Sequence, residues 1–459
     1  MRRDTVINKF SQSLQNDCGA IFVGSGISCP STKVDWFKLL EPLTNELDIK
    51  IDNGKDDLPQ IAQYIVNNYS GNRGPLINEI AKAFSGKFST NKYHKYLSTT
   101  KVSTIWTTNY DTLLERAFSD FHLDVKINDD SISRNIMNSE IEIIKMHGCI
   151  AGSKHEDIVI AQEDYEDFPI KKPAISQRLS NDLLKKSFLF IGYSYRDPNI
   201  RNIMIEARRL CNRSTQQHYL ITTKVKKVEN EDENLYKEKF IRQKLWCDDL
   251  KRLGISTLLI DKHNELEDIL ELISQKSRGK TIYVTGSHEK TNETSRQLGV
   301  KMADDKGITL VSGQSSGIGA NTVSAFIEQC ILKKHDINCR LKIFPNPYAA
   351  NAKYSNDPKL LGDLKKYRAK LFNSTQIVVV FNGGMGTEAE VEVALNQNCK
   401  IIPVILTGED RNSDVMRKIL KNGLIMNQIE KLDKEYYDKI IGSEVAVEDI
   451  HKCLMKFLE

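Results

Sequence analysis

Residues 20–28 read AIFVGSGIS, an apolar run that ends in a short turn rich in glycine and serine. Similar runs, each followed by a small-residue turn and a longer amphipathic stretch, recur along the chain: STIWTTN (103–109), EIIKMHG (142–148), FLFIGYS (188–194), TIYVTGS (281–287), TLVSGQS (309–315) and IVVVFNGG (377–384). This alternation is typical of strand, loop and helix in doubly wound α/β sheets. Such folds bind ligands at the carboxyl ends of their strands, so we expect the functional residues in these turns.

The chain divides into two such sheets. After a highly charged stretch at 223–240, which we interpret as a solvated loop or helix, GISTLLID (254–261) has the pattern of a last strand and NELEDILELISQ (264–275) that of a last helix. A short polar linker at 274–280 precedes a fresh strand. The sequence therefore predicts an α/β protein with two doubly wound, Rossmann-like domains at residues 1–277 and 278–459.

Composition restricts the classes of function. The 459 residues carry 65 basic and 61 acidic side chains, a net charge of only +4, with no basic stripe that could follow a phosphate backbone, so we expect no nucleic-acid partner. The first residues lack the apolar core of a secretion signal, and the apolar runs are too short to cross a bilayer. We expect a cytoplasmic protein without a membrane partner. The nine cysteines include no Cys-x-x-Cys pair, so neither a zinc ribbon nor a disulfide framework is predicted.

Polar residues end four probable strands of the first domain. They form the turn Gly24-Ser25-Gly26-Ile27-Ser28, the stretch from Thr107 to Asp111, the pair His147-Gly148, and GYSYRDPN (192–199). Glycines allow backbone N–H groups to approach a pyrophosphate, although the third glycine of the usual dinucleotide fingerprint is replaced by Cys29. Each motif alone is equally compatible with a turn, a helix cap or a partly buried side chain.

The four motifs in this order resemble the sirtuin family over about residues 15–275. The resemblance implies an NAD site with the nicotinamide ribose beside Asn109, Asp111 and His147. His147 would be the general base, because an imidazole accepts protons near neutral pH, and Asn109 would position a ribose hydroxyl or the attacking water. Asn109 and His147 are thus the predicted catalytic residues, and the predicted NAD contacts are Gly24, Ser25, Gly26, Ile27, Ser28, Asn109, Asp111, His147, Gly192, Tyr193, Ser194 and Asp197.

The departures from sirtuins concern the acceptor. Protein-deacylating sirtuins carry a four-cysteine zinc module after the catalytic histidine, whereas the 43 residues between Gly148 and Gly192 contain only Cys149. Water is therefore the expected acceptor, NAD the substrate, and neither zinc nor another cofactor is expected. The segment AQEDYEDF (161–168) resembles an acidic segment of bacterial sirtuin-like defence proteins, and we assign it no catalytic role. A protein deacylase and a non-catalytic nucleotide sensor remain alternatives.

The second domain contains three glycine-rich turns, at Gly286-Ser287, at 313–319 and at 383–387. Together with GGMGTEAE (383–390) and KYRAKLF (366–372), they resemble the LOG-like nucleotide-binding superfamily, SLOG, over about residues 279–459. Asn382 stands where the enzymes of that superfamily usually have proline, which favours ligand sensing over phosphoribohydrolase activity. The predicted ligand contacts are Gly286, Ser287, Gly313, Ser315, Gly317, Arg368, Lys370, Gly383, Gly384, Gly386, Thr387, Glu388 and Glu390.

Roles are assigned to three of these contacts. Arg368 would bind phosphate through its forked guanidinium, and Glu390 or Glu388 would bind ribose hydroxyls. Solvated charges on a helix are the alternative for all three, since Arg368 lies in a charged stretch and acidic residues are favourable in the first turn of a helix.

A sirtuin-like domain joined to a SLOG domain resembles the NAD-consuming effectors of Thoeris antiphage systems over nearly the whole chain. The resemblance implies that a partner TIR-domain enzyme makes a cyclic ADP-ribose isomer, that the SLOG domain binds it, and that the first domain then depletes NAD. It also implies a homo-oligomer, a tetramer. The sequence leaves open which isomer activates and whether NADP is used. It also leaves open whether the ADP-ribosyl group is transferred to water or cyclised.

Overall fold

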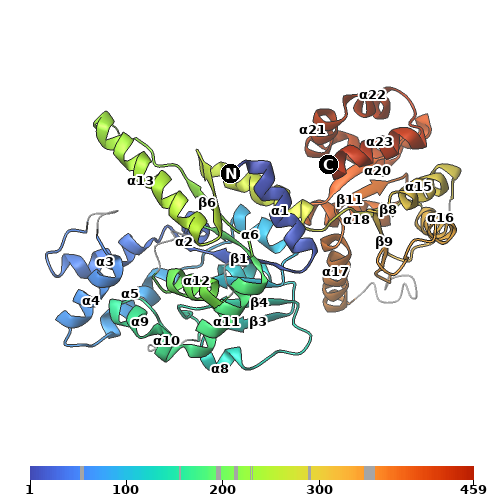
Figure 1. Ribbon diagram of the computed structural model, residues 1–459. Helices are drawn as coiled ribbons and strands as arrows, with labels where there is room; N and C mark the ends of the chain where they lie inside the picture. The colour runs from blue at the N-terminus through green and yellow to red at the C-terminus, as the bar shows by residue number, and fades with distance from the viewer. Residues whose placement is uncertain are drawn as a thin grey trace. The chain divides into compact units, whose positions relative to one another are not determined.

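The computed structural model describes residues 1–51, 56–152, 154, 157–192, 198–210, 216–227, 229, 231–287, 291–345 and 357–459. They form two compact units, one of Met1–Ser98 with Val102–Ile273 and the other of Thr99–Lys101 with Ser274–Glu459. Each unit contains one parallel sheet with helices around it (Figure 1). The predicted fold class, two doubly wound α/β domains, is confirmed.

The described part of the N-terminal unit has a seven-stranded parallel sheet in the order β3-β4-β2-β1-β5-β6-β7. Every quoted strand pattern of this domain forms a strand, and β1 is central, with Ile21 beside both Ile105 and Leu189. The turns after β1, β2, β4 and β5 therefore meet at one edge of the sheet. The strands are β1 (Gly19–Val23), β2 (Thr104–Thr107), β3 (Leu123–Lys126), β4 (Ile141–Lys145), β5 (Ser187–Ile191), β6 (His218–Thr223) and β7 (Ile255–Ile260).

Helices cover both faces of this sheet, which explains why its central strands are apolar throughout. In β1, Ile21 and Val23 join the core on one face, and Ala20 and Phe22 join the core on the other. The helices are α1 (Arg3–Gln15), α2 (Ser25–Thr32), α3 (Trp36–Asn45), α4 (Leu58–Asn68), α5 (Gly74–Phe84), α6 (Lys92–Ser98), α7 (Leu113–Ala117), α8 (Asp129–Ile132), α9 (Gln162–Glu166), α10 (Phe168–Lys171), α11 (Pro173–Lys185), α12 (Pro198–Leu210), α13 (Glu233–Arg252) and α14 (Asn264–Lys276).

Three of these helices, α3, α4 and α5, form a lobe with its own apolar core, grouped beside α9 in Figure 1. Its helices bury residues at helical spacing, such as Ile61 and Ile65 in α4. Tyr110, from the turn after β2, and Ile158 and Ile160, from the segment after β4, belong to the same core. The lobe is thus built directly onto two of the turns predicted to be functional.

The charged stretch at 223–240 leads into α13, a helix of 20 residues whose only buried side chain is Leu250. Asp232 caps its first turn by accepting hydrogen bonds from the backbone N–H groups of Asn234 and Leu235. In Figure 1 the helix extends past the sheet. Among the helices that the structure describes, none is both long and apolar enough to cross a membrane.

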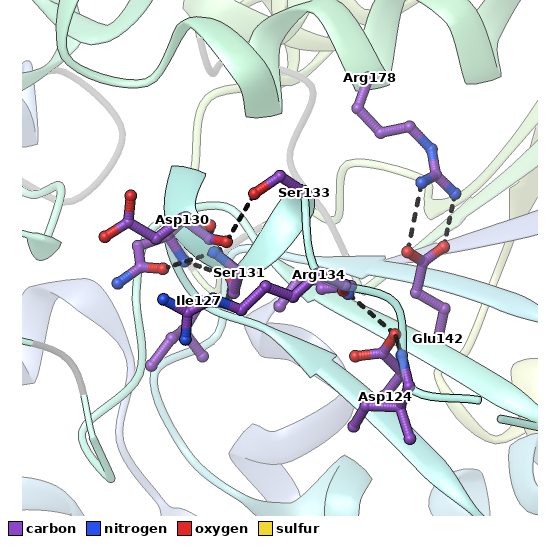
Figure 2. A network of polar contacts seen from close by, with 11 residues as sticks. Asp124, Ile127, Asp130, Ser131, Ser133, Arg134, Glu142 and Arg178 are labelled. Atoms are coloured by element: carbon purple, nitrogen blue, oxygen red, sulfur yellow. Dashed lines mark hydrogen bonds and ion pairs between the residues drawn. The ribbon is translucent and has the colours of Figure 1, made fainter.

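A polar network joins α11 and α8 to the sheet (Figure 2). The guanidinium of Arg178 in α11 faces both carboxylate oxygens of Glu142 in β4, and its Nε lies 3.2 Å from an oxygen of Asp182. Ser131 and Asn128 form the capping box of α8, whose Asp129 accepts hydrogen bonds from the first turn of α11. Glu142 lies near the start of its strand, so this network stabilises the sheet away from the turns described above.

The C-terminal unit has a parallel sheet of five described strands in the order β10-β9-β8-β11-β12. The strands are β8 (Thr281–Thr285), β9 (Thr309–Ser312), β10 (Leu341–Ile343), β11 (Ile377–Val380) and β12 (Lys400–Pro403). The strand order reverses between β8 and β11, which is where doubly wound sheets bind ligands. The helices are α15 (Glu293–Asp304), α16 (Ile318–Leu332), α17 (Pro358–Asn373), α18 (Met385–Asn396), α19 (Gly408–Asn412), α20 (Asp414–Lys421), α21 (Gly423–Leu432), α22 (Lys434–Gly442) and α23 (Val447–Leu458).

Candidate active site

The turn after β1 is held against the end of β5 by backbone hydrogen bonds. Gly24 N–H donates to the Ile191 carbonyl at 2.9 Å and Gly26 N–H donates to the Gly192 carbonyl at 2.8 Å. A side chain on Gly26 would place its Cβ 3.0 Å from the Gly192 Cα, and Gly192 itself has a φ of +57°. Both glycines are therefore required by the close approach of two backbones. The exposed Ser25 begins α2, whose N-terminus can attract a phosphate.

Asn109 is buried next to this turn with a fixed amide orientation. Its Nδ2 donates to the Gly24 carbonyl at 3.3 Å and to Ser28 Oγ at 3.2 Å. A carbonyl only accepts hydrogen bonds, so Oδ1 must point the other way. Within the described residues this oxygen is buried and has no hydrogen-bond partner. It is therefore an unsatisfied acceptor, which a ribose hydroxyl or a water molecule would satisfy on reaching it.

Asp111 follows Asn109 and is anchored to the neighbouring strand. Its Oδ1 accepts a hydrogen bond from Leu113 N–H at 2.9 Å, and its main-chain carbonyl accepts one from the amine of Lys145, at the end of β4. Lys145 also pairs with Glu115 at 2.8 Å. Burial opposes the charge on Lys145, but Glu115, Cys149 and Asp111 together outweigh this effect and raise the pKa of the amine. A permanently charged lysine thus joins the turn after β2 to the strand that leads to His147.

His147 lies two residues beyond β4 and is only 2% exposed. Its carbonyl accepts a hydrogen bond from Val159 N–H at 3.1 Å. Its ring is edge-on to Tyr165 and Phe168, with centroids 5.4 and 6.3 Å away. The acidic segment at 161–168 therefore packs on the predicted general base.

One half-buried cation, Arg73, and one buried cation, Lys172, hold this covering segment. Arg73 of the helical lobe pairs with Asp164 at 2.7 Å, and Asp164 also accepts hydrogen bonds from the N–H groups of Ile160 and Ala161. Lys172 donates to the Met146 carbonyl at 3.1 Å and to the Asp157 carbonyl at 2.7 Å. Burial lowers the pKa of Lys172 to about 8, an effect that nearby carboxylates only partly oppose.

A small cavity of about 50 Å³, open to solvent, brings part of the predicted site together. Its lining includes Ser25, Ser28, Asn109 and Asp111, whereas His147 is not among the residues that line it. Tyr193, Ser194 and Asp197 lie outside the described residues. The lining also includes residues that the sequence analysis did not single out, among them Trp36, Leu39 and Phe84 of the helical lobe. The amphipathic spacing of α3 to α5 indicates buried helices, but it does not indicate which turn they cover.

In the C-terminal unit, the turns after β8 and β11 are bonded to each other. Ser287 N–H donates to the Asn382 carbonyl at 2.9 Å, and Thr387 Oγ1 donates to the Gly286 carbonyl at 3.2 Å. A Cβ on Gly383 would lie 2.2 Å from Thr387 Oγ1, so only glycine fits there. Gly384 caps α18, and Gly386 is exposed in its first turn.

Glu390, one of the two residues predicted to bind ribose, is bonded to other side chains of the protein in this structure. It accepts hydrogen bonds from the hydroxyls of Tyr283, at 3.1 Å, and Thr285, and it forms an ion pair with Arg368 of α17. Burial raises the pKa of Tyr283, which therefore stays protonated as a donor. In this structure Glu390 thus orients Arg368. Glu388 pairs with Lys418 on the outside of α18, and Lys370 is partly buried on α17.

Two hollows lie at the ends of these strands. One is too narrow to hold a water molecule and is lined by Gly313, Ser315 and Tyr283 among others. The other, of about 330 Å³ and open to solvent, is lined by Ser287 and Gly383 with Phe381, Asn382 and Asp410 among others. Gly317 caps the N-terminus of α16 with a φ of +66°. Arg368, Lys370, Glu388 and Glu390 line neither hollow.

Comparisons with known proteins match both units. A model of the SIR2-like domain family matches residues 103–243, and a model of the Sir2- and TIR-associating SLOG family matches residues 265–459. The chain is 29% identical to NAD(+) hydrolase ThsA of Bacillus cereus (strain MSX-D12), over 99% of this chain and 97% of that protein. It is 30% identical to NAD(+) hydrolase ThsA of Acinetobacter baumannii (strain 532279), over 88% and 87% of the two chains.

A third relative, NAD(+) hydrolase ThsA of Enterococcus faecium, is 32% identical over 76% of each chain. In these relatives the alignment spans most of both proteins, so it includes the sirtuin-like and the SLOG unit together. The order of the two matched domain families is also the order of the two sheets in the structure. The chain therefore belongs to the ThsA family of NAD(+) hydrolases, built from a SIR2-like domain followed by a SLOG domain.

Proposed function

We propose that the N-terminal unit hydrolyses NAD to nicotinamide and ADP-ribose. The observation that carries this proposal is the buried amide of Asn109, whose Nδ2 is bonded to Gly24 and Ser28 and whose Oδ1 is left as an acceptor at the cavity. Cleaving the nicotinamide–ribose bond passes through a state with positive charge on the ribose. A fixed amide oxygen and the carboxylate of Asp111 can orient the ribose and the water and stabilise that charge.

In this proposal the pyrophosphate of NAD lies on the turn from Gly24 to Ser28, against the N-terminus of α2. His147 takes the proton from the attacking water or a ribose hydroxyl, and the rings of Tyr165 and Phe168 hold its imidazole. His147 is only 2% exposed and does not line the cavity, so its approach to the substrate requires a rearrangement of the covering segment. No resident metal or cofactor takes part.

The C-terminal unit is proposed to bind the activating nucleotide, a cyclic ADP-ribose isomer made by a TIR-domain enzyme. Its support is the pair of bonded glycine turns where the strand order of the sheet reverses, together with a hollow large enough for a nucleoside. The ligand must bind the active arrangement more tightly than the inactive one, since equal affinity shifts no equilibrium. In a bacterial cytoplasm, a homotetramer activated in this way would deplete NAD as a defence against phage.

The test is nicotinamide release from NAD by the purified chain, with and without ADP-ribose and its cyclic isomers. Release should require a nucleotide and should fall at least 100-fold in Asn109→Ala and in His147→Ala, because each removes a group that acts on the reacting ribose or water. Full release without nucleotide would contradict the activation step. No release under any condition would leave a non-catalytic nucleotide sensor, and turnover of an acyl-lysine peptide would indicate a deacylase.

A further inference from the structure

One side chain outside the predicted site joins the dinucleotide turn to the rest of the domain. Asn91 precedes α6, and its Nδ2 donates to the Ile27 carbonyl at 2.9 Å and to Ser31 Oγ at 3.0 Å, both in α2. Its Oδ1 accepts hydrogen bonds from the N–H groups of Tyr93 and His94 at the start of α6. All four bonds belong to a single amide, so the first turn of α6 and the whole of α2 are held in one arrangement.

The same turn holds a buried imidazole near Asp111. His94 is 0% exposed, and its Nδ1 accepts a hydrogen bond from Asn91 N–H at 3.3 Å. A neutral ring with an accepting Nδ1 carries its proton on Nε2. That Nε2 is buried without a hydrogen-bond partner among the described residues. Burial lowers the pKa of His94, and the carboxylate of Asp111 opposes this effect. The imidazole is therefore buried with one ring nitrogen left without a partner among the described residues.

We propose that Asn91 is a positioning residue for NAD: its amide holds α2, and with it the Gly24–Ser28 turn, where the pyrophosphate meets the N-terminus of the helix. The inference rests on the proposed function, because it assigns the dinucleotide to this turn. It concerns binding and not bond cleavage, since Asn91 is not among the residues that line the cavity.

The test is Asn91→Asp, which has nearly the same shape. The aspartate keeps an oxygen for the N–H groups of α6, where a negative charge is favourable. It replaces the donor that faces the Ile27 carbonyl with a second acceptor, which removes the hydrogen bonds from residue 91 to α2. The dissociation constant for NAD should rise about tenfold, which is the effect expected when hydrogen bonds between uncharged groups are lost. KM should rise in proportion, and kcat should stay within about twofold.

Two further variants make the result specific. Ser31→Ala removes only one of the two bonds to α2 and leaves Asn91 intact, so NAD affinity should fall by a smaller factor in the same direction. Asn422→Asp is the matched control, because Asn422 caps α21 in the other unit through the same kind of amide oxygen. It should leave NAD binding unchanged. Ser31→Ala also keeps the inference testable if Asn91→Asp fails to fold.

The measurements are isothermal titration with NAD, steady-state nicotinamide release, and thermal unfolding of each variant. A lower unfolding temperature with an unchanged dissociation constant for NAD would overturn the inference, because hydrogen bonds that serve only the fold would affect stability alone. A fall in kcat with unchanged KM would overturn it as well. If the wild-type chain binds NAD but releases no nicotinamide, the proposed hydrolysis fails while the binding data still decide the role of Asn91.

Discussion

The buried amine of Lys172 predicts an unusual pH dependence of stability. The side chain is 5% exposed, and burial lowers its pKa from the ordinary value of 10.5 to about 8. Asp157, Asp129 and Asp164 favour the charged amine and Arg73 opposes it, but none of them outweighs the loss of water. Between pH 8 and 10.5 the unfolded chain therefore binds more protons at this site than the folded chain. The contribution of this site to stability therefore rises with pH across that window, and below about pH 8 it stays at its lowest value because both states are protonated.

The size of the effect follows from the two pKa values. The difference between the two pKa values changes the free energy of unfolding by ~3 kcal/mol in all. Of this change, ~2 kcal/mol occurs between pH 7 and 9.5. Many other groups titrate in this range, so the quantity to measure is the difference between the wild type and Lys172→Met. The wild type should gain ~2 kcal/mol relative to the variant over that interval, because only the wild type sheds a buried charge.

The assay is urea unfolding followed by tryptophan fluorescence. All three tryptophans, at positions 36, 106 and 246, belong to the N-terminal unit, so the signal reports the unit that contains Lys172. Lys171→Met is the control, since the Lys171 side chain is 53% exposed and pairs with Asp167. The difference in free energy of unfolding between Lys171→Met and the wild type should not depend on pH. A Lys172→Met difference that stays constant from pH 7 to 9.5 would refute the assignment of a buried, charged amine beside the His147 segment.

Two substitutions test the glycine turn and the SLOG network. Gly192→Ala should destabilise the N-terminal unit by about 2 kcal/mol and weaken NAD binding, because φ is +57° and the new Cβ would lie 2.7 Å from Ile27 N. Chemical denaturation and NAD titration measure the two effects, and an unchanged stability and affinity would contradict the close approach of the two backbones. Glu390→Gln should reduce the affinity for ADP-ribose, titrated calorimetrically, about tenfold by releasing Arg368, and unchanged affinity would show that Arg368 does not depend on its carboxylate partner.

Local patterns were sufficient for the fold class. Runs such as AIFV, TIWT and IVVV are short, apolar and followed by small residues, and in the structure they are the buried parallel strands β1, β2 and β11. The turn glycines could be recognised for the same reason, because a strand end that meets a helix N-terminus needs residues without a Cβ. The common edge that gathers Gly24, Ser28, Asn109 and Asp111 follows from parallel strand order alone.

Contacts across long sequence separations were not predictable in this way. Part of the lining of the cavity comes from α3 and α5, whose amphipathic pattern specifies burial but not the partner surface. Asn91 reaches α2 across more than 60 residues, and the inward orientation of Glu390 depends on Tyr283 and Thr285 from another strand. The sequence by itself thus determined the fold class and the strands and turns with the clearest apolar pattern. Only the tertiary structure decided which polar side chains are buried and how they are satisfied, because desolvation and hydrogen bonding depend on neighbours that the chain supplies from far away.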